Sequence, residues 1–502
     1  MANRVRFLSQ LSAVLAVASL GLTGPLAAQP RTDVVVGMSI EPAGLDPTVA
    51  APVAIGQVVW QNLFEGLTRI DAEGQVQPQL AREWTISEDG LVYTFELEPD
   101  VAFHNGAVFD AAAAKFTLDR ARGEASTNPQ KAFFSTIASV EAVGPTTLVV
   151  NLSKPTGNLL YWLAWPASVM VEPGSAETNR TQPVGTGPFR FGSWQQGDRV
   201  ELVRAEGYWN EADIPALEAL TFRFINDPQA QVSALQAGQV DAFPNLQAPE
   251  LFATLEGDDT FETVAGNTEL KVVAGMNGRR KPFDDPRVRR ALMMAVDRAG
   301  LVDGAWSGFG TPIGSHYTPN DPGFVDLSAE VPYDPEGARA LLAEAGYPDG
   351  FTATIRSPQM AYATRSSEIL QAFFAEIGVT LEIVPTEFPA VWVEQVLQGH
   401  DFNMTIVAHA EPLDIGIYAR PDYYFGYDNA AFDETIEKAE RATDPDARFA
   451  LYGEAQRMLA TDLPALYLFV MPKLGVWKAG LEGFWVNEPI PSNDLTDVSW
   501  RN

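Results

Sequence analysis

One short loop carries side chains that could bind a charged ligand. It follows an apolar run ending at Val407, and it holds His409, Glu411 and Asp414 within residues 408–414. A carboxylate in this loop could form a charge-assisted bond with a ligand ammonium group, or it could cap a turn of the loop itself. His409 with Glu411 would suit a chelated ion, but two ligands are too few for a bare metal. We therefore predict a ligand-binding site here, with no metal and no cofactor.

Aromatic and polar residues elsewhere could complete the site. Tyr423 and Tyr424 follow the loop, and Trp392 lies on a predicted helix before it, as either a stacking wall or a core residue. Asn277 ends a predicted strand, and Glu41 lies in a proline-rich loop, where it could equally be a turn residue. The candidate ligand-binding residues are Glu41, Asn277, Trp392, His409, Glu411, Asp414, Tyr423 and Tyr424.

The sequence lacks the motifs of common enzyme classes. There are four histidines and no cysteine, with no HExxH zinc motif and no nucleophile elbow. Gly185 and Gly187 form a Gly-x-Gly, but no lysine follows them, so a phosphate-binding loop is not predicted. A glycosidase would need two facing carboxylates, which a sequence alone does not place. We predict a binding protein, not an enzyme, with a hydrolase as the remote alternative.

Composition limits the class of protein and of partner. A chain of 502 residues with 46% hydrophobic and 20% charged residues should fold into two or more globular domains. Its formal net charge of −31 argues against nucleic acid and anionic membranes as partners, and it is compatible with cationic or zwitterionic ligands. Without cysteine, neither a disulfide nor a lipid-modified cysteine can form.

The first 28 residues resemble a secretory signal peptide. Arg4 and Arg6 precede an apolar core at Leu11–Leu22, and small residues up to Ala28 offer a cleavage site. No later stretch is long and apolar enough to span a bilayer. We therefore expect an exported protein, free in the periplasm and not inserted in a membrane.

Predicted strands and helices alternate in the second half of the chain. Apolar runs at 351–355, 379–384 and 401–407 alternate with helical patterns at 366–377 and 389–398. This order predicts a mostly parallel sheet with helices on both faces, and ligands bind such sheets beyond the carboxyl ends of the strands. The loop at 408–414 lies at such an end.

A strand–turn–helix unit begins at Leu270. Asp285 before Pro286 predicts a helix N-cap with proline at the first helical position. Val288, Ala291, Leu292 and Ala295 then form one apolar helical stripe.

Several runs of residues resemble one family over nearly the whole chain after residue 28. The matching positions are residues 62–67; Leu80, Trp84, Asp89, Gly90, Tyr93, Phe95 and residues 103–106; residues 183–189; and Asn277, Pro282, Phe283, Asp285, Ala291, Asp297 and Arg298. The chain is similar here to the large extracytoplasmic solute-binding proteins, family 5, of peptide and nickel ABC importers.

The resemblance implies an α/β, two-lobed periplasmic-binding-protein fold (class II, large type) with an extra subdomain in the first lobe. We expect lobe I at 29–266 plus 476–502, with the subdomain at about 70–185, and lobe II at 267–475. Closure about the crossings Gly266–Leu270 and Leu474–Gly480 would trap a ligand.

The resemblance also implies the function. We expect a receptor that captures a small peptide or peptide-like solute and delivers it to the permease subunits of an ABC importer, acting as a monomer. In peptide-binding relatives an aspartate in the 408–414 loop holds the ligand α-amino group, and here either Glu411 or Asp414 could take that role. Opine and nickel-chelate receptors share the fold. An oligosaccharide is a further alternative, because tryptophans could stack on sugars; these are Trp60, Trp162, Trp165, Trp306 and Trp392.

Overall fold

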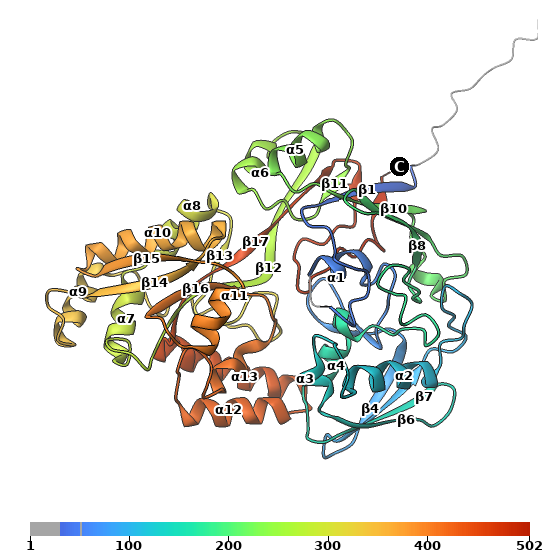
Figure 1. Ribbon diagram of the computed structural model, residues 1–502, viewed down its shortest axis with the longest axis horizontal. Coiled ribbons are helices and arrows are strands. Elements are labelled where there is room, and N and C mark those ends of the chain that lie inside the picture. The colour runs from blue at the N-terminus through green and yellow to red at the C-terminus, as the bar shows by residue number, and fades with distance from the viewer. Residues whose placement is uncertain (1–30, 51–52, 502) are drawn as a thin grey trace, which may run out of the picture.

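The computed structural model describes residues 31–50 and 53–501, so the predicted signal peptide at 1–28 lies outside the described residues. Two lobes lie side by side and are joined by a pair of long strands, β12 (Phe261–Met276) and β17 (Ala465–Lys478) (Figure 1). This arrangement agrees with the two-lobed fold that the sequence predicts. Within the described residues, no helix is both long enough and apolar enough to cross a membrane.

One sheet runs through both lobes. Its strand order is β15 (Thr380–Thr386), β14 (Thr352–Pro358), β16 (Met404–His409), β12, β17, β11 (Ala242–Phe243), β1 (Asp33–Met38), β10 (Ala219–Phe224), β9 (Arg199–Arg204) and β8 (Phe189–Gln195), with β13 (Thr311–Pro312) paired to β17. In the second lobe β14 is parallel to β15 and β16, but β12 is antiparallel to β16 and β17.

The sheet of the second lobe is therefore mixed, which corrects the prediction of a mostly parallel sheet. The strand–helix alternation that supported that prediction covers only β14, β15 and β16. The other two strands connect the lobes in opposite directions: β12 enters the second lobe from the first, and β17 leaves the second lobe toward the first. A local pattern does not reveal this.

The two crossing strands form one antiparallel ribbon with an irregular point between the lobes. Pairing is regular from Phe261 to Asn267, shifts register, and resumes at Lys271 opposite Val470. Thr268 also donates its hydroxyl to the Met471 carbonyl at 2.8 Å. A bulge in a ladder bends the strand locally. On β17 the interruption of the pairing lies between Val470 and Pro472.

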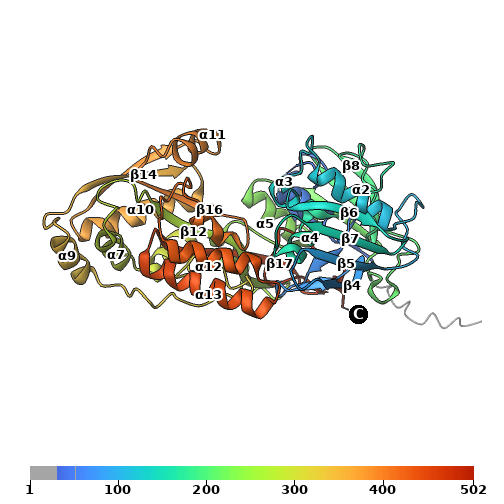
Figure 2. The same ribbon diagram turned by 90° about the horizontal axis from the view of Figure 1, so that it is seen from below.

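The first lobe carries a separate four-stranded antiparallel sheet. Its order is β4 (Ala81–Ile86), β5 (Val92–Leu97), β7 (Thr147–Leu152) and β6 (Ile137–Ala142). Helix α2 (Ala111–Arg122) packs against β6 and β7 (Figure 2). These elements share a hydrophobic core of their own, separate from the main core. We refer to them as the subdomain.

Local sequence explains where several helices begin. Asp110 accepts hydrogen bonds from the backbone N–H groups of Ala112 and Ala113, and Asp285 accepts one from Arg287. The side chains of the stripe predicted from Val288 to Ala295 are buried, so both the cap and the stripe predicted from sequence are confirmed.

The remaining helices surround the sheets. In the first lobe they are α1 (Val53–Val59), α3 (Lys131–Phe134), α4 (Leu159–Leu163), α5 (Pro228–Gln236) and α6 (Pro249–Leu255). In the second lobe they are α7 (Pro286–Met294), α8 (Arg298–Trp306), α9 (Pro335–Glu344), α10 (Ala361–Glu376), α11 (Ala390–Trp392), α12 (Ala430–Arg441) and α13 (Pro445–Asp462). Short β2 (Thr68–Ile70) pairs with β3 (Val76–Pro78), and β18 (Leu481–Glu482) with β19 (Ser499–Trp500).

Candidate ligand-binding cleft

A cleft of about 520 Å³ lies between the subdomain and the second lobe. On the subdomain side it is lined around α3 and α4, and on the other side by the chain that follows β16 and by α12. The polar and aromatic lining residues are Gln130, Phe133, Thr136, Lys154, Thr156, Asn158, Trp162, Trp165, Glu411, Asp414, Arg420, Tyr423, Glu440 and Tyr452. The volume is in the range of small-molecule sites.

A second cavity of about 230 Å³ shares residues with this cleft. Gln130, Trp165 and Glu411 line both spaces, and the second one also reaches Pro47 and Ala50 of the first lobe. Glu411 therefore faces open space on the boundary between the lobes, where a bound ligand would contact both.

The loop at 408–414 is held in a constrained conformation. Strand β16 ends at His409, Leu413 adopts a left-handed φ of 54°, and Asp414 begins the 3₁₀ helix η4 (Asp414–Ala419). A left-handed backbone at a non-glycine residue is strained, and it persists where surrounding contacts fix it. Here one such contact is a 2.7 Å hydrogen bond from the Lys271 ammonium to the carbonyl of Glu411.

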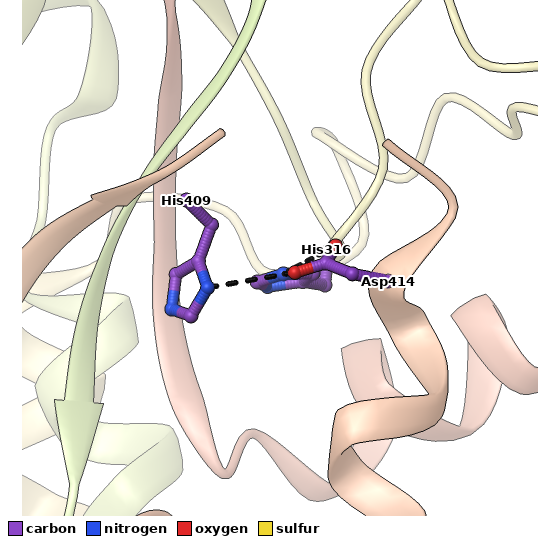
Figure 3. Close-up of side chains that lie close together, drawn as sticks. All are labelled: His316, His409 and Asp414. Carbon is purple, nitrogen blue, oxygen red and sulfur yellow. Dashed lines mark hydrogen bonds and ion pairs between the residues drawn. The ribbon is translucent and has the colours of Figure 1, made fainter. Parts of the chain in front are cut away.

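Asp414 contacts three buried basic side chains, of which Figure 3 draws His316 and His409. Its carboxylate oxygens lie 3.0 Å from His316 Nε2, 3.3 Å from Lys271 Nζ and 3.5 Å from His409 Nδ1. Burial by itself would raise the pKa of Asp414, but the interactions with His316, Lys271 and His409 outweigh it and hold that pKa well below the usual value. Asp414 is therefore ionised, and its counter-charge is Lys271.

The outer nitrogens of both histidines are held by tyrosines. His316 Nδ1 lies 3.1 Å from the Tyr418 hydroxyl, and His409 Nε2 lies 2.9 Å from the Tyr424 hydroxyl. Burial lowers the pKa of His316 to about 4, so this imidazole is neutral at neutral pH. The neutral His316 ring donates its Nε2–H to the Asp414 carboxylate, and its Nδ1 accepts a hydrogen bond from the Tyr418 hydroxyl. The network fixes the direction of the Asp414 side chain.

The same three side chains could be considered as metal ligands. One ligand atom from each of His316, His409 and Asp414 lies within 4.8 Å of the others. However, the Lys271 ammonium shares the Asp414 carboxylate at 3.3 Å, and a dication placed there would be repelled strongly in a buried site. The arrangement fits an internal ion pair better than a metal centre, so no metal is assigned.

Three of the predicted site residues line the cleft, namely Glu411, Asp414 and Tyr423. Glu411 is exposed, and among the described residues its carboxylate has no hydrogen-bond or ion-pair partner. Two more lie directly behind Asp414, because His409 contacts it and Tyr424 contacts His409. The structure thus brings five of the predicted residues into one region.

The other three predicted residues lie outside the lining of both cavities. Trp392 is buried, donates to the Thr405 hydroxyl at 2.9 Å and packs on Tyr424. Asn277 is buried and donates to the His400 and Phe402 carbonyls.

Glu41 also has its hydrogen bonds satisfied away from the cleft. It accepts from the Trp194 indole and the Gly197 backbone at the turn between β8 and β9. Pro47, at the other end of the Glu41 loop, does reach the second cavity.

Sequence reasoning missed two members of the network. Lys271 is a charged residue in the apolar run of β12, and a buried lysine in such a run signals a fixed anionic partner. His316 lies in an irregular segment with no local pattern that indicates its role. The cations Lys154 and Arg420, which line the cleft, were also not selected.

We expect His316 alone to lower the free energy of unfolding by about 2 kcal/mol between pH 7 and pH 5. Its pKa is about 4 in the folded protein, against an ordinary value of 6.5. The unfolded chain therefore binds the proton first as pH falls, and stability decreases through this window. Urea titrations of the wild type and His316→Gln at both pH values measure the difference. Burial also lowers the pKa of His104 to about 4, but this affects both proteins equally. An identical pH dependence in the two would contradict the prediction.

The structure has two lobes, a bent ribbon that joins them and a cleft between them. This arrangement is typical of a protein that encloses a solute. Comparisons with known proteins identify the family. The profile of the bacterial extracellular solute-binding proteins, family 5, matches residues 75–435. The chain belongs to this family, and it is a solute-binding protein of an ABC importer.

Similar proteins cover nearly the whole chain. The glutathione-binding protein GsiB of Salmonella paratyphi A is 32% identical over 494 residues, which cover 94% of this chain and 96% of that protein. The structure of HbpA2 from Haemophilus parasuis superposes with a TM-score of 0.85 at 24% identity, covering 94% and 100% of the two chains. A dipeptide-binding protein from Pseudoalteromonas in complex with Met-Leu has a TM-score of 0.75 at 22% identity, covering 93% and 100%. These structures support the fold that the sequence predicts.

Proposed function

We propose that this protein captures a small peptide or peptide-like solute with a free ammonium group and delivers it to a membrane permease. The observation that carries the proposal is the unpaired Glu411 carboxylate at the boundary of the two lobes. A ligand ammonium can pair with it, whereas Asp414 three residues later is already paired with Lys271. Of the two acids that the sequence offers as partners for the ligand ammonium group, Glu411 is therefore the better candidate.

The opposite charge is also present in the cleft. Among the described residues, the side chains of Lys154 and Arg420 have no ion-pair partner, and both line the cleft. They can bind the carboxylate of a zwitterionic ligand, while Trp162 and Tyr423 supply apolar surface along its length. Peptides carry both charges, and so does glutathione, for which the Salmonella relative is named.

Ligand capture requires the lobes to close. The bulge at Asn267–Lys271 offers a bending point where pairing is already interrupted. A ligand that contacts both lobes stabilises the closed state by its differential affinity for that state. We propose that the protein acts in the periplasm after removal of a signal peptide, as a monomer that the permease recognises in its closed form.

We expect peptides or glutathione to raise the melting temperature and to be recovered chemically unchanged. Binding to the native state alone stabilises by RT ln(1 + [L]/Kd), about 2.7 kcal/mol at a hundredfold excess over Kd. Thermal denaturation with a panel of dipeptides, glutathione and oligosaccharides measures the shift, and mass spectrometry of the bound fraction identifies the product. Hydrolysis of a bound ligand would reject the receptor function.

Oligosaccharides are the second candidate because Trp162 and Trp165 both line the cleft. If oligosaccharides raise the melting temperature and no peptide does, the proposed ligand class becomes oligosaccharides.

A further inference from the structure

We propose that Lys271 determines the charge that the cleft offers to its ligand. By neutralising Asp414 it leaves Glu411 as the one unpaired carboxylate of the 408–414 loop, so that this loop offers a ligand one negative charge and not two. The site therefore binds a ligand with a second ammonium group less well than it would with an unpaired Asp414. Glu440 of α12 also lines the cleft, and its charge is the same in every variant of Lys271 and Asp414. The inference rests on the proposed function, and it names a specificity-determining residue that lies outside the cleft lining.

The contacts of Lys271 support this role. Its side chain is fully buried, and its ammonium lies 3.3 Å from Asp414, 2.7 Å from the Glu411 carbonyl and 3.4 Å from the Glu269 carbonyl. The ammonium thus joins the two acids of the loop through different atoms, the side chain of one and the main chain of the other. It neutralises Asp414 and positions the main chain of Glu411.

His316, which lies closest to Asp414, does not supply its counter-charge. His316 is neutral at neutral pH because burial lowers its pKa. Burial also raises the pKa of the nearby acids Glu269 and Asp321, which shifts both toward the neutral form. The Lys271–Asp414 pair with the neutral His316 has no net charge, and removal of either member changes the net charge beside Glu411 by one unit.

Lys271 lies in β12 at the bulge where the ribbon between the lobes can bend. It is the first residue after the bulge that resumes pairing with β17, opposite Val470, and it also pairs with His409 of β16. The side chain therefore extends from the bent part of the ribbon to the ligand-binding loop. A shift of β12 on closure would be transmitted to the Glu411 carbonyl through one hydrogen bond.

The test compares two peptides that differ by one ammonium group, Ala-Ala and Lys-Ala, by calorimetric titration. Lys271→Met leaves Asp414 without a cation, and we expect the affinity ratio to shift toward Lys-Ala by at least tenfold. Asp414→Asn leaves Lys271 without an anion, and the ratio should shift in the opposite direction. The double variant Lys271→Met/Asp414→Asn should restore the wild-type ratio, because its net charge is that of the wild type.

Lys473→Met is the matched control. Lys473 is also buried on the crossing ribbon, but it donates to the Trp485 and Asn487 carbonyls, away from the loop. Its loss should leave the ratio unchanged. A purely structural role for Lys271 would instead weaken both peptides equally in every variant of the pair, and that result would overturn the proposal.

A second measurement does not need a ligand. NMR titration of the imidazoles follows His316, whose pKa is lowered in part by the Lys271 charge. In Lys271→Met we expect His316 to bind its proton more tightly than in the wild type, and an unchanged or lower pKa of His316 would contradict the charge pairing. If the wild type binds no peptide, the proposed function fails, yet this titration still tests the charge pairing. Should Lys271→Met fail to fold, Asp414→Asn must still shift the peptide ratio, and an unchanged ratio there overturns the proposal.

Discussion

Glu411→Gln should weaken the binding of ligands with a free ammonium group by about 2 to 5 kcal/mol, the usual cost of removing one partner of a buried charge pair. Glu411 is exposed in the structure, and closure of the lobes over a ligand would bury it against the ammonium group. The glutamine keeps the size of the side chain but not its charge. Calorimetric titration with the tightest peptide of the panel gives the difference.

N-acetylation of the peptide provides the complementary change. It should cost the wild type a similar free energy of binding and should cost Glu411→Gln little, because the partner is already missing. Glu437→Gln is a suitable control, since that glutamate is exposed on α12, pairs with Arg441 and does not line the cleft. Equal binding of free and acetylated peptides by the wild type would refute the ammonium site and favour the oligosaccharide alternative.

Asp414→Asn should reduce the free energy of unfolding by about 3 to 5 kcal/mol at pH 7, the range found when one member of a buried ion pair is removed. The substitution leaves the Lys271 ammonium in a fully buried position without its anion. It also removes the carboxylate that both histidines contact. Equilibrium denaturation in urea, followed by circular dichroism, measures the loss.

The control for Asp414 is an exposed aspartate with cationic partners. Asp401 lies 3.0 Å from Arg280 and 3.6 Å from Arg356, and its side chain is 68% exposed. Asp401→Asn should therefore cost no more than about 1 kcal/mol. The double variant Lys271→Met/Asp414→Asn should recover part of the lost stability, because both charges are then absent. A loss at Asp414 no larger than that at Asp401 would show that the network contributes little to stability.

Part of the candidate site could be predicted from the sequence. The acids of the 408–414 loop were found because they follow an apolar strand, and Glu411, Asp414 and Tyr423 do line the cleft. The sequence offers Glu41 and Asn277 as polar candidates near loops, but nearby main-chain and indole groups already satisfy their hydrogen bonds. An isolated polar residue in a sequence does not show which neighbours it will contact.

Features that depend on local pattern and on family resemblance could be predicted without the structure. The cap at Asp285, the buried stripe on α7, the two-lobed α/β fold and the receptor class all agree with the structure and the comparisons. These features follow from residue spacing over a few turns, or from matches along the whole chain, and both are present in the sequence as printed.

Only the tertiary structure separated the roles of Glu411 and Asp414. The two acids lie three residues apart, and nothing in the local sequence distinguishes their roles. In the folded chain Lys271 of β12 and His316 of a distant loop approach Asp414, whereas Glu411 faces the space between the lobes. The charge and exposure of a carboxylate depend on the groups within a few ångströms of it, and here those groups come from segments far away in the sequence.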